Sequence, residues 1–437
     1  MSKSISIEEL EGNISTYFQQ QQDKKKFIPG KTLIQYAGAV YNQDEILAIV
    51  RASLRGWFGM DKEGRALEKE LEDYLPVKKA YLTNSGSSSD LLAVASLMSK
   101  KLPDRINKGD EVITPACTFP TVVSALIQNG LKPVFVDVDP ETLNPKPEDV
   151  EKAIRKKTRL LFIVHMLGNP NDMDKIMKIA KKNNLFVLED NCDALGSIYK
   201  GKKTGTFGEL STESFYPGHH MTTAGEGGAV FVNDKRLIDI VGSIRDWGRS
   251  YKPKGEASIK DNDYDERLNR KIGIEHYDER YIYTEIGFNF KLTEIQAAMG
   301  RVQLRRLPEF IKKRNKNFNI LFKFFKDYEK FFILPKATEG SVPSWFSFPL
   351  TLRDNVPFNR LDITLFLEKN RIETRPLFAG NILRQPAFKD IEYRVSGTLN
   401  NSDKVFKNTF FIGVYPGIQE DEMNYITSIL RKFLNKY

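Results

Sequence analysis

The segment ESFYPGHHMTTAGEGGAVF (213–231) places two histidines, His219 and His220, between a predicted strand and a glycine-rich turn. Glycine allows the backbone to bring neighbouring side chains against a ligand. Because histidine titrates near neutral pH, either imidazole could move a proton during a reaction. A hydrogen-bonded histidine without a catalytic role is the competing interpretation, and it is favoured for His220. His219 is therefore the candidate base.

Two further segments have the chemistry to bind charged groups. TNSGSSSD (83–90) is a Gly/Ser turn before an apolar helical run, so hydroxyls and helix N-terminal N–H groups could bind a phosphate. An ordinary capped helix start is the alternative. LFVLEDNCDALG (185–196) ends a strand at Glu189 and Asp190, where a carboxylate could stabilise a protonated heteroaromatic nitrogen. An acidic strand end or helix N-cap is the alternative there.

Short apolar runs bounded by Gly, Pro or Asp surround these segments and read as buried strands. Helical apolar spacing between them alternates with the strands, which predicts an α/β fold with a largely parallel sheet. The predicted strands are 112–116, 133–139, 160–167, 185–190, 213–217 and 227–234, and the predicted helices between them are 119–129, 147–156 and 172–183.

The chain of 437 residues exceeds the size at which one core stops growing, so two domains are expected. A polar N-terminal arm (1–31) precedes a large domain (32–306), in which 249–280 is a polar surface insertion. A small C-terminal domain (307–437) follows. Helices are predicted at 293–306, at about 308–328, at 359–369 and at 419–435.

Composition excludes several classes of protein. The net charge of +9 comes from scattered Lys and Arg without a nucleic-acid-binding signature, so no nucleic-acid partner is expected. Since no apolar run is long enough for a membrane span and the start lacks a secretory signal, a cytoplasmic enzyme is expected. Cys117 and Cys192 are the only cysteines, and the four histidines lack metal-ligand spacing, so no metal site is predicted.

Taken together, these segments resemble the DegT/DnrJ/EryC1/StrS family of sugar aminotransferases. The resemblance implies a fold-type-I pyridoxal-phosphate architecture, with a mostly parallel seven-stranded sheet in the large domain and a small α+β domain. Members of that family carry a Ser five residues before the lysine that holds the cofactor. Here Ser214 is followed five residues later by His219, and no lysine lies between Lys203 and Lys235.

The resemblance also implies roles for individual residues. It assigns the cofactor phosphate to Gly86, Ser87 and Ser214, the face of the pyridine ring to Phe119, the pyridine nitrogen to Asp190 and the vicinity of the ring hydroxyl to Asp193. Asn289, in GFNFKLTEIQAAMG (287–300), would reach the phosphate in a neighbouring subunit, which makes the active unit a homodimer. A plain helix entry at Thr293 is compatible with that role.

Further side chains are candidates for contact with a nucleotide-sugar substrate, although a capped turn or a surface arginine is the commoner explanation for several of them. They are His165, His220, Trp247, Arg249, Arg375 and Arg384.

Histidine in place of the lysine changes the expected reaction, because histidine can move a proton but cannot hold the cofactor covalently. The chain is similar to the nucleotide-sugar 3-dehydratase branch, in which pyridoxamine phosphate, bound without a covalent link, acts on a 4-keto-6-deoxy sugar in 3-deoxysugar and O-antigen biosynthesis. His219 would be the base and the reaction would be loss of the C3 hydroxyl.

The most similar members of that branch act on cytidine-diphosphate 4-keto-6-deoxyglucose and carry an iron–sulfur cluster on four cysteines. Only Cys192 is present here, because the other three positions fall on Ser250, Lys252 and Lys260. No cluster is therefore expected, and L-glutamate is the expected donor that regenerates the amine cofactor. A dehydrase that needs an external reductase and a sugar-binding relative without catalysis remain the alternatives.

Overall fold

The large sheet contains eight strands in the order β1-β9-β8-β5-β4-β2-β3-β16. The computed structural model describes residues 5–22, 26–250 and 264–437. Within that part of the chain, β9 runs antiparallel to both of its neighbours and the remaining pairs are parallel. The strands are β1 (Lys79–Thr83), β2 (Glu111–Pro115), β3 (Lys132–Val136), β4 (Thr158–Val164), β5 (Phe186–Asp190), β8 (Leu210–Ser214), β9 (Gly228–Val232) and β16 (Arg394–Val395).

The predicted α/β class and the mostly parallel sheet are confirmed, but the sheet has eight strands rather than seven. The eighth, β16, comes from the C-terminal part of the chain and pairs with β3 at the sheet edge. The Arg394 guanidinium binds the Glu111 carboxylate at 2.6 Å, which brings this distant segment to the sheet. β1 is a further strand that the apolar runs did not predict. The strand predicted at 213–217 ends at Ser214, so His219 lies in the loop that follows.

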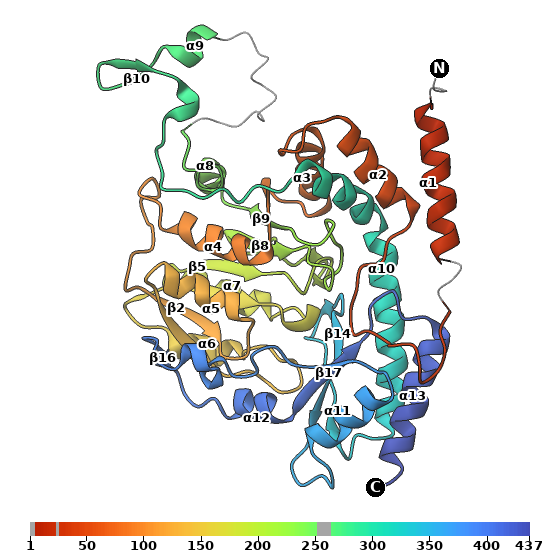
Figure 1. Ribbon diagram of the computed structural model, residues 1–437. Coiled ribbons are helices and arrows are strands. Elements are labelled where there is room, and N and C mark those ends of the chain that lie inside the picture. Colours follow the sequence, from red (N-terminus) through yellow and green to blue (C-terminus); the bar gives the residue numbers. More distant parts are fainter. Residues whose placement is uncertain (1–4, 23–25, 251–263) are drawn as a thin grey trace.

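Helices cover both faces of the sheet, as Figure 1 shows. Because side chains alternate along a strand, Phe162 and Leu188 pack against α4 (Gly86–Leu97) and α5 (Pro120–Gln128) in one apolar cluster. Leu161 and Val187, their neighbours in sequence, pack against α6 (Pro147–Ala153) and α7 (Met173–Asn183) in another. Burial on both faces explains why these strands are continuously apolar. Other helices are α1 (Ile7–Gln22), α2 (Gln43–Leu54), α3 (Lys62–Tyr74) and α8 (Ile238–Arg245).

A smaller antiparallel sheet has its own aromatic core. Its strands follow the order β12-β14-β17-β15. Rings such as Phe318, Phe325 and Phe348 fill the space between this sheet and its helices. The elements are β12 (Phe332–Ile333), β14 (Ser347–Leu352), β15 (Thr374–Pro376), β17 (Thr409–Gly413), α11 (Arg360–Lys369), α12 (Asn400–Asn408) and α13 (Glu420–Leu434). A three-stranded sheet of β6 (Ile198–Tyr199), β7 (Lys202–Lys203) and β13 (Ser341–Val342) joins the two regions.

One helix, α10 (Glu294–Lys326), replaces the two helices predicted around residue 307. Pro308 lies inside it and removes one backbone donor, but Leu307 and Phe310 are buried on either side, and this packing sustains the helix. Figure 1 shows α10 passing from α2 and α3 to α13 and the small sheet. The predicted domain boundary at 306/307 falls within this helix and stays a prediction.

The described parts of the predicted arm and insertion lie at the surface of the molecule, whereas 1–4, 23–25 and 251–263, with Lys252 and Lys260, lie outside the described residues. No residue of α1 is buried, and the helix contacts α2. In the insertion, the described residues form a short helix, α9 (Tyr264–Leu268), and a hairpin of β10 (Arg270–Ile272) and β11 (Glu275–Tyr277) that projects from the rest of the protein (Figure 1). All positions of that hairpin's strands are exposed. None of the helices in the described ranges combines the length and apolar character that crossing a membrane requires.

Candidate active site

A cavity of about 430 Å³ opens at the carboxyl ends of the parallel strands, the usual position of a ligand site in such sheets. β5 ends there at Asp190, β8 ends at Ser214, and α4 begins there at Gly86. The cavity brings together all of the predicted catalytic and cofactor residues except Asn289: Gly86, Ser87, Phe119, Asp190, Asp193, Ser214 and His219.

The start of α4 forms a cradle for an anion. Ser85 caps the helix, since its hydroxyl accepts from the Ser88 N–H at 3.1 Å. Gly86 approaches β8 so closely that an added Cβ would lie 2.6 Å from the Ser214 Cβ. Free N–H groups of a helix N-terminus, two serine hydroxyls and a glycine without a side chain suit a phosphate. These residues fit the phosphate of the cofactor that the sequence predicted.

Asp190 provides the negative charge at the floor of the cavity. Its carboxylate accepts from the Cys192 N–H at 3.0 Å. Burial raises the pKa of Asp190, and it raises the pKa of Asp90 behind it much further, because the charge of Asp190 adds to the effect. Asp90 is held by the hydroxyls of Thr121 at 2.9 Å and Thr212 at 2.7 Å. The pKa of Asp190 is raised less than that of Asp90, so Asp190 is the more acidic of the pair, and a cationic ring nitrogen would favour its ionised form.

An aromatic wall faces this floor. Phe119 directly precedes α5, and the residue is 47% exposed and lines the cavity, so its ring is available to a ligand. The ring of Phe378 supports it edge-on at 5.5 Å, and Phe346 packs against Phe378 at 6.3 Å. An aromatic face above a buried carboxylate fits a pyridine ring.

His219 enters the cavity from the loop after β8. Its Nδ1 lies 3.4 Å from Oδ1 of Asp193, whose second oxygen accepts from the Leu167 N–H at 3.3 Å. The imidazole also contacts the ring of Phe346, with 5.4 Å between centroids. A carboxylate beside Nδ1 favours the tautomer protonated there, which leaves Nε2 as the proton acceptor.

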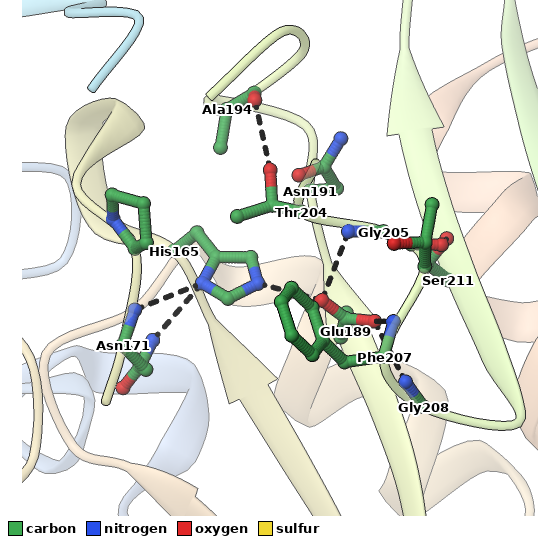
Figure 2. Close-up of polar contacts among 12 residues, drawn as sticks. His165, Asn171, Glu189, Asn191, Ala194, Thr204, Gly205, Phe207, Gly208 and Ser211 are labelled. Carbon is green, nitrogen blue, oxygen red and sulfur yellow. Dashed lines mark hydrogen bonds and ion pairs between the residues drawn. The ribbon is translucent and has the colours of Figure 1, made fainter. Parts of the chain in front are cut away.

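The structure does not bring His165 to the cavity. Figure 2 shows its imidazole between Asn171 and Glu189, and the residue is fully buried. Nδ1 accepts from the backbone N–H of Asn171 at 3.2 Å, so Nε2 carries the proton and donates to Glu189 at 3.0 Å. Burial opposes the charge of Glu189, but the bonds from His165 and from the amides of Gly205 and Gly208 outweigh it and lower the pKa of this carboxyl. His165 therefore has a structural role.

His220 also packs away from the cavity. Its Nε2 donates to the Ser344 carbonyl at 2.8 Å. Burial lowers the pKa of His220 well below its usual value, and the Arg314 charge adds to this effect. The structure thus agrees with the structural interpretation of His220.

The other predicted substrate residues lie outside the set that lines the cavity. Arg384 is exposed and pairs with Asp403 at 2.6 Å. Arg375 lies at the margin, where its guanidinium stacks at 4.5 Å on Tyr36, a residue that does line the cavity. Trp247 lies under the charges of Arg249 and Lys291.

Asn289 is exposed, and its backbone forms an isolated antiparallel β-bridge with Asp246, next to Trp247. Within one chain it does not reach the cavity wall.

Several lining residues were missed by sequence reasoning. Ser85 lies within the TNSGSSSD motif and Thr121 lies two residues after Phe119, but neither had an assigned role, and Cys192 had been considered as a cluster ligand. Tyr36, Phe346 and Phe378 come from distant parts of the chain and carry no local signal. Tyr216 and Glu226 flank the histidines, where they had no assigned role.

Residues 40–431 match the DegT/DnrJ/EryC1/StrS aminotransferase family. The chain belongs to this family. It is 42% identical over 430 residues to the lipopolysaccharide biosynthesis protein RfbH of Salmonella typhimurium, covering 98% of this chain and 97% of that protein. It is also 42% identical over 422 residues to the dTDP-4-dehydro-2,6-dideoxy-D-glucose 3-dehydratase of Saccharopolyspora spinosa, covering 96% of this chain and 90% of that protein.

A solved structure extends this similarity to the fold. The crystal structure of a GDP-4-keto-6-deoxymannose-3-dehydratase with a trapped PLP-glutamate geminal diamine superposes with a TM-score of 0.80 at 29% identity. The match covers 90% of this chain and 99% of that one. The predicted family and fold-type-I architecture are confirmed. In the described residues, no group of three or more His, Cys, Asp or Glu side chains is arranged to hold a metal ion.

Proposed function

We propose that this protein is a pyridoxal/pyridoxamine-phosphate-dependent 3-dehydratase that acts on a nucleotide-diphosphate 4-keto-6-deoxy sugar. The observation that carries the proposal is the identity of residue 219, a histidine inside the cavity at the position where the family resemblance expects the cofactor lysine. None of the described residues that line the cavity is a lysine. Names of two relatives, both 3-dehydratases of nucleotide sugars, support the same reaction class.

Each part of the cavity has a function in this proposal. Gly86, Ser87 and Ser214 hold the phosphate of the cofactor, Phe119 covers its ring, and Asp190 keeps the ring nitrogen protonated. The amine form of the cofactor, when bound, supplies an electron sink that weakens the bond to the C3 hydroxyl of the sugar. No covalent link to the protein is needed.

His219 moves the proton. Its Nε2 accepts the proton that leaves C4′ of the cofactor, and Asp193 beside Nδ1 stabilises the imidazolium that forms. The imidazolium can then donate this proton to the departing C3 hydroxyl, so that the sugar loses one molecule of water. An imidazole cannot take the place of lysine in releasing an aminated product, and this favours dehydration over transamination.

The remaining partners follow from the same assignment. L-glutamate would regenerate the amine cofactor, which agrees with the PLP-glutamate adduct in the related dehydratase. Two copies of the chain would form a homodimer in which Asn289 reaches the cofactor phosphate of the neighbouring subunit. The name of RfbH, a lipopolysaccharide biosynthesis protein, supports a role in that pathway class. We propose that the reaction serves O-antigen or other polysaccharide biosynthesis and takes place in the cytoplasm.

The test is incubation of the purified protein with pyridoxamine phosphate, glutamate and a panel of nucleotide-linked 4-keto-6-deoxy sugars. Mass spectrometry should detect loss of water from one of them, with release of ammonia. Borohydride treatment of the PLP-loaded protein should leave no cofactor attached to a lysine. Conversion that requires an added reductase would favour the electron-transfer alternative. Failure to bind either cofactor form would favour a non-catalytic, sugar-binding protein.

A further inference from the structure

Arg314 lies in α10 and is one of the most deeply buried large side chains of the described protein, with 1% exposure. Its Nη2 donates to the carbonyl oxygen of His219 at 2.7 Å, and its Nη1 donates to that of Phe346 at 2.8 Å. A longer contact of 3.5 Å reaches the Gly218 carbonyl. Each of these acceptors is a neutral backbone oxygen.

Such an arrangement is costly, because a buried charge is usually paired with an opposite one. Burial lowers the pKa of Arg314 to about 10, and only the more distant charges of Asp193 and Tyr415 oppose this effect. A shorter or neutral side chain would avoid the cost. The benefit of arginine must therefore come from its planar fork, which can bind several acceptors at fixed angles.

The acceptors belong to two segments that meet at the imidazole. Gly218 and His219 lie in the loop after β8, and Phe346 directly precedes β14. The ring of Phe346 is itself the neighbour of the His219 ring. Arg314 thus joins the backbone that carries the candidate base to the backbone that carries the residue packed against it.

We propose that Arg314 is a positioning residue for His219, because its guanidinium fixes the loop after β8 against the start of β14 and so directs the imidazole into the cavity. It touches the base only through the backbone. This inference rests on the proposed function, in which His219 is the base.

The charged and titratable groups around the imidazole agree with this arrangement. Asp190 and Asp193 face it from the end of β5, the ring of Tyr216 lies 6.4 Å from it, and Arg314 binds the backbone carbonyl of the same residue from α10. His220 follows it in the loop and stays neutral, for the reasons given above. The imidazole therefore has two carboxyl groups and a tyrosine beside it, while the buried guanidinium binds the backbone that carries it.

The test compares Arg314→Met and Arg314→Lys with the wild type, with Arg306→Met as control. Arg306 lies in the same helix and pairs with buried Glu45 at 2.6 Å. Glu45 is linked to the loop through Gln303 and the Thr222 N–H, so loss of Arg306 should lower stability while the carbonyls of Gly218 and His219 keep their donor, Arg314. Misplacing a catalytic group by about 1 Å can cost about 100-fold in rate, so Arg314→Met should lower kcat by about that factor. KM and cofactor affinity should change little. Arg314→Lys should give an intermediate kcat, and Arg306→Met should keep the wild-type kcat.

A second measurement needs neither cofactor nor substrate. The chain has four histidines, so a histidine-labelled NMR spectrum is simple, and His219→Asn identifies the relevant signal. Arg314→Met should shift and broaden that signal, whereas the signal of His276 in the exposed hairpin should stay unchanged. If Arg314→Met does not fold, Arg314→Lys replaces it in this comparison.

A wild-type kcat together with an unchanged His219 signal in the folded variants would overturn the proposal. If the wild type itself performs no dehydration, the proposed function fails. The NMR comparison would still report whether Arg314 positions His219.

Discussion

The Nδ1 atom of His219 lies 3.4 Å from Oδ1 of Asp193, and the two residues reach this contact from different strands of the large sheet. Asp193 follows β5 and His219 follows β8, which are parallel neighbours. Asp193 was predicted from the family resemblance to lie near the ring hydroxyl of the cofactor. In the proposed reaction, its position suits a second task, which is to orient the imidazole and stabilise its charged form.

Substitution Asp193→Asn should therefore lower kcat by about 10- to 100-fold, a part of what a general base contributes. The amide has nearly the shape of the carboxylate but lacks the charge that stabilises an imidazolium. Steady-state kinetics would measure the effect, and the cofactor absorbance spectrum would show that the site is still loaded. Asp403→Asn, at the exposed pair with Arg384, is the control. A wild-type kcat in Asp193→Asn would contradict this role.

Substitution Gly86→Ala should weaken cofactor binding by at least about tenfold, which corresponds to about 1.4 kcal/mol. The new methyl group would lie 2.6 Å from the Ser214 Cβ, so the serine must move out of the phosphate cradle. Fluorescence titration with pyridoxamine phosphate would measure the affinity. Gly12→Ala is the matched control, because nothing lies within 4 Å of its added Cβ. Equal affinities in the two variants would show that the cradle does not bind the phosphate.

The protein should become less stable as the pH is lowered, in part because of His220. Burial depresses the pKa of this histidine below the ordinary value of 6.5, so the unfolded chain binds a proton where the folded protein does not. The stabilising contribution is present above pH 6.5 and is lost as the pH falls toward the folded-state pKa. In urea unfolding at about pH 7.5 and about pH 5.5, His220→Gln should lose less stability than the wild type. Parallel losses would indicate that His220 is not buried in its neutral form.

The pair of His165 and Glu189 should matter for stability rather than for catalysis. The Glu189 carboxylate accepts hydrogen bonds from His165 and from the backbone amides of Gly205, Phe207 and Gly208. In Glu189→Gln one carboxylate oxygen becomes an NH2 group, which would point at N–H donors and leave them without an acceptor. Leaving such buried groups unsatisfied costs about 1–3 kcal/mol each. Denaturant unfolding would measure the loss, with exposed Glu148→Gln as control. If Glu189→Gln changed the KM for the sugar but left stability unchanged, the result would instead support a role of His165 in substrate binding.

Much of the fold was predictable because it depends on neighbours in the sequence. The continuously apolar strands at 160–167 and 185–190 indicated burial on both faces, and the Gly/Ser turn before α4 indicated an anion site. The limits of such reasoning appear around Pro308, where two helices, 293–306 and about 308–328, were predicted and one continuous helix is found. Packing of Leu307 and Phe310 against distant residues decided otherwise.

The sequence by itself determined the identity of the candidate base, since a histidine stands five residues after Ser214 in a stretch without lysine. It also determined the strand-end position of Asp190, because the apolar run 185–190 is a local pattern, whereas the end of β8 at Ser214 came only from the structure. Only the tertiary structure decided that His165 is buried beside Glu189, that Phe346 and Phe378 complete the wall, and that Arg314 holds the loop of His219. These relationships join residues far apart in the chain, and they arise from the packing of whole sheets and helices, which no local spacing encodes.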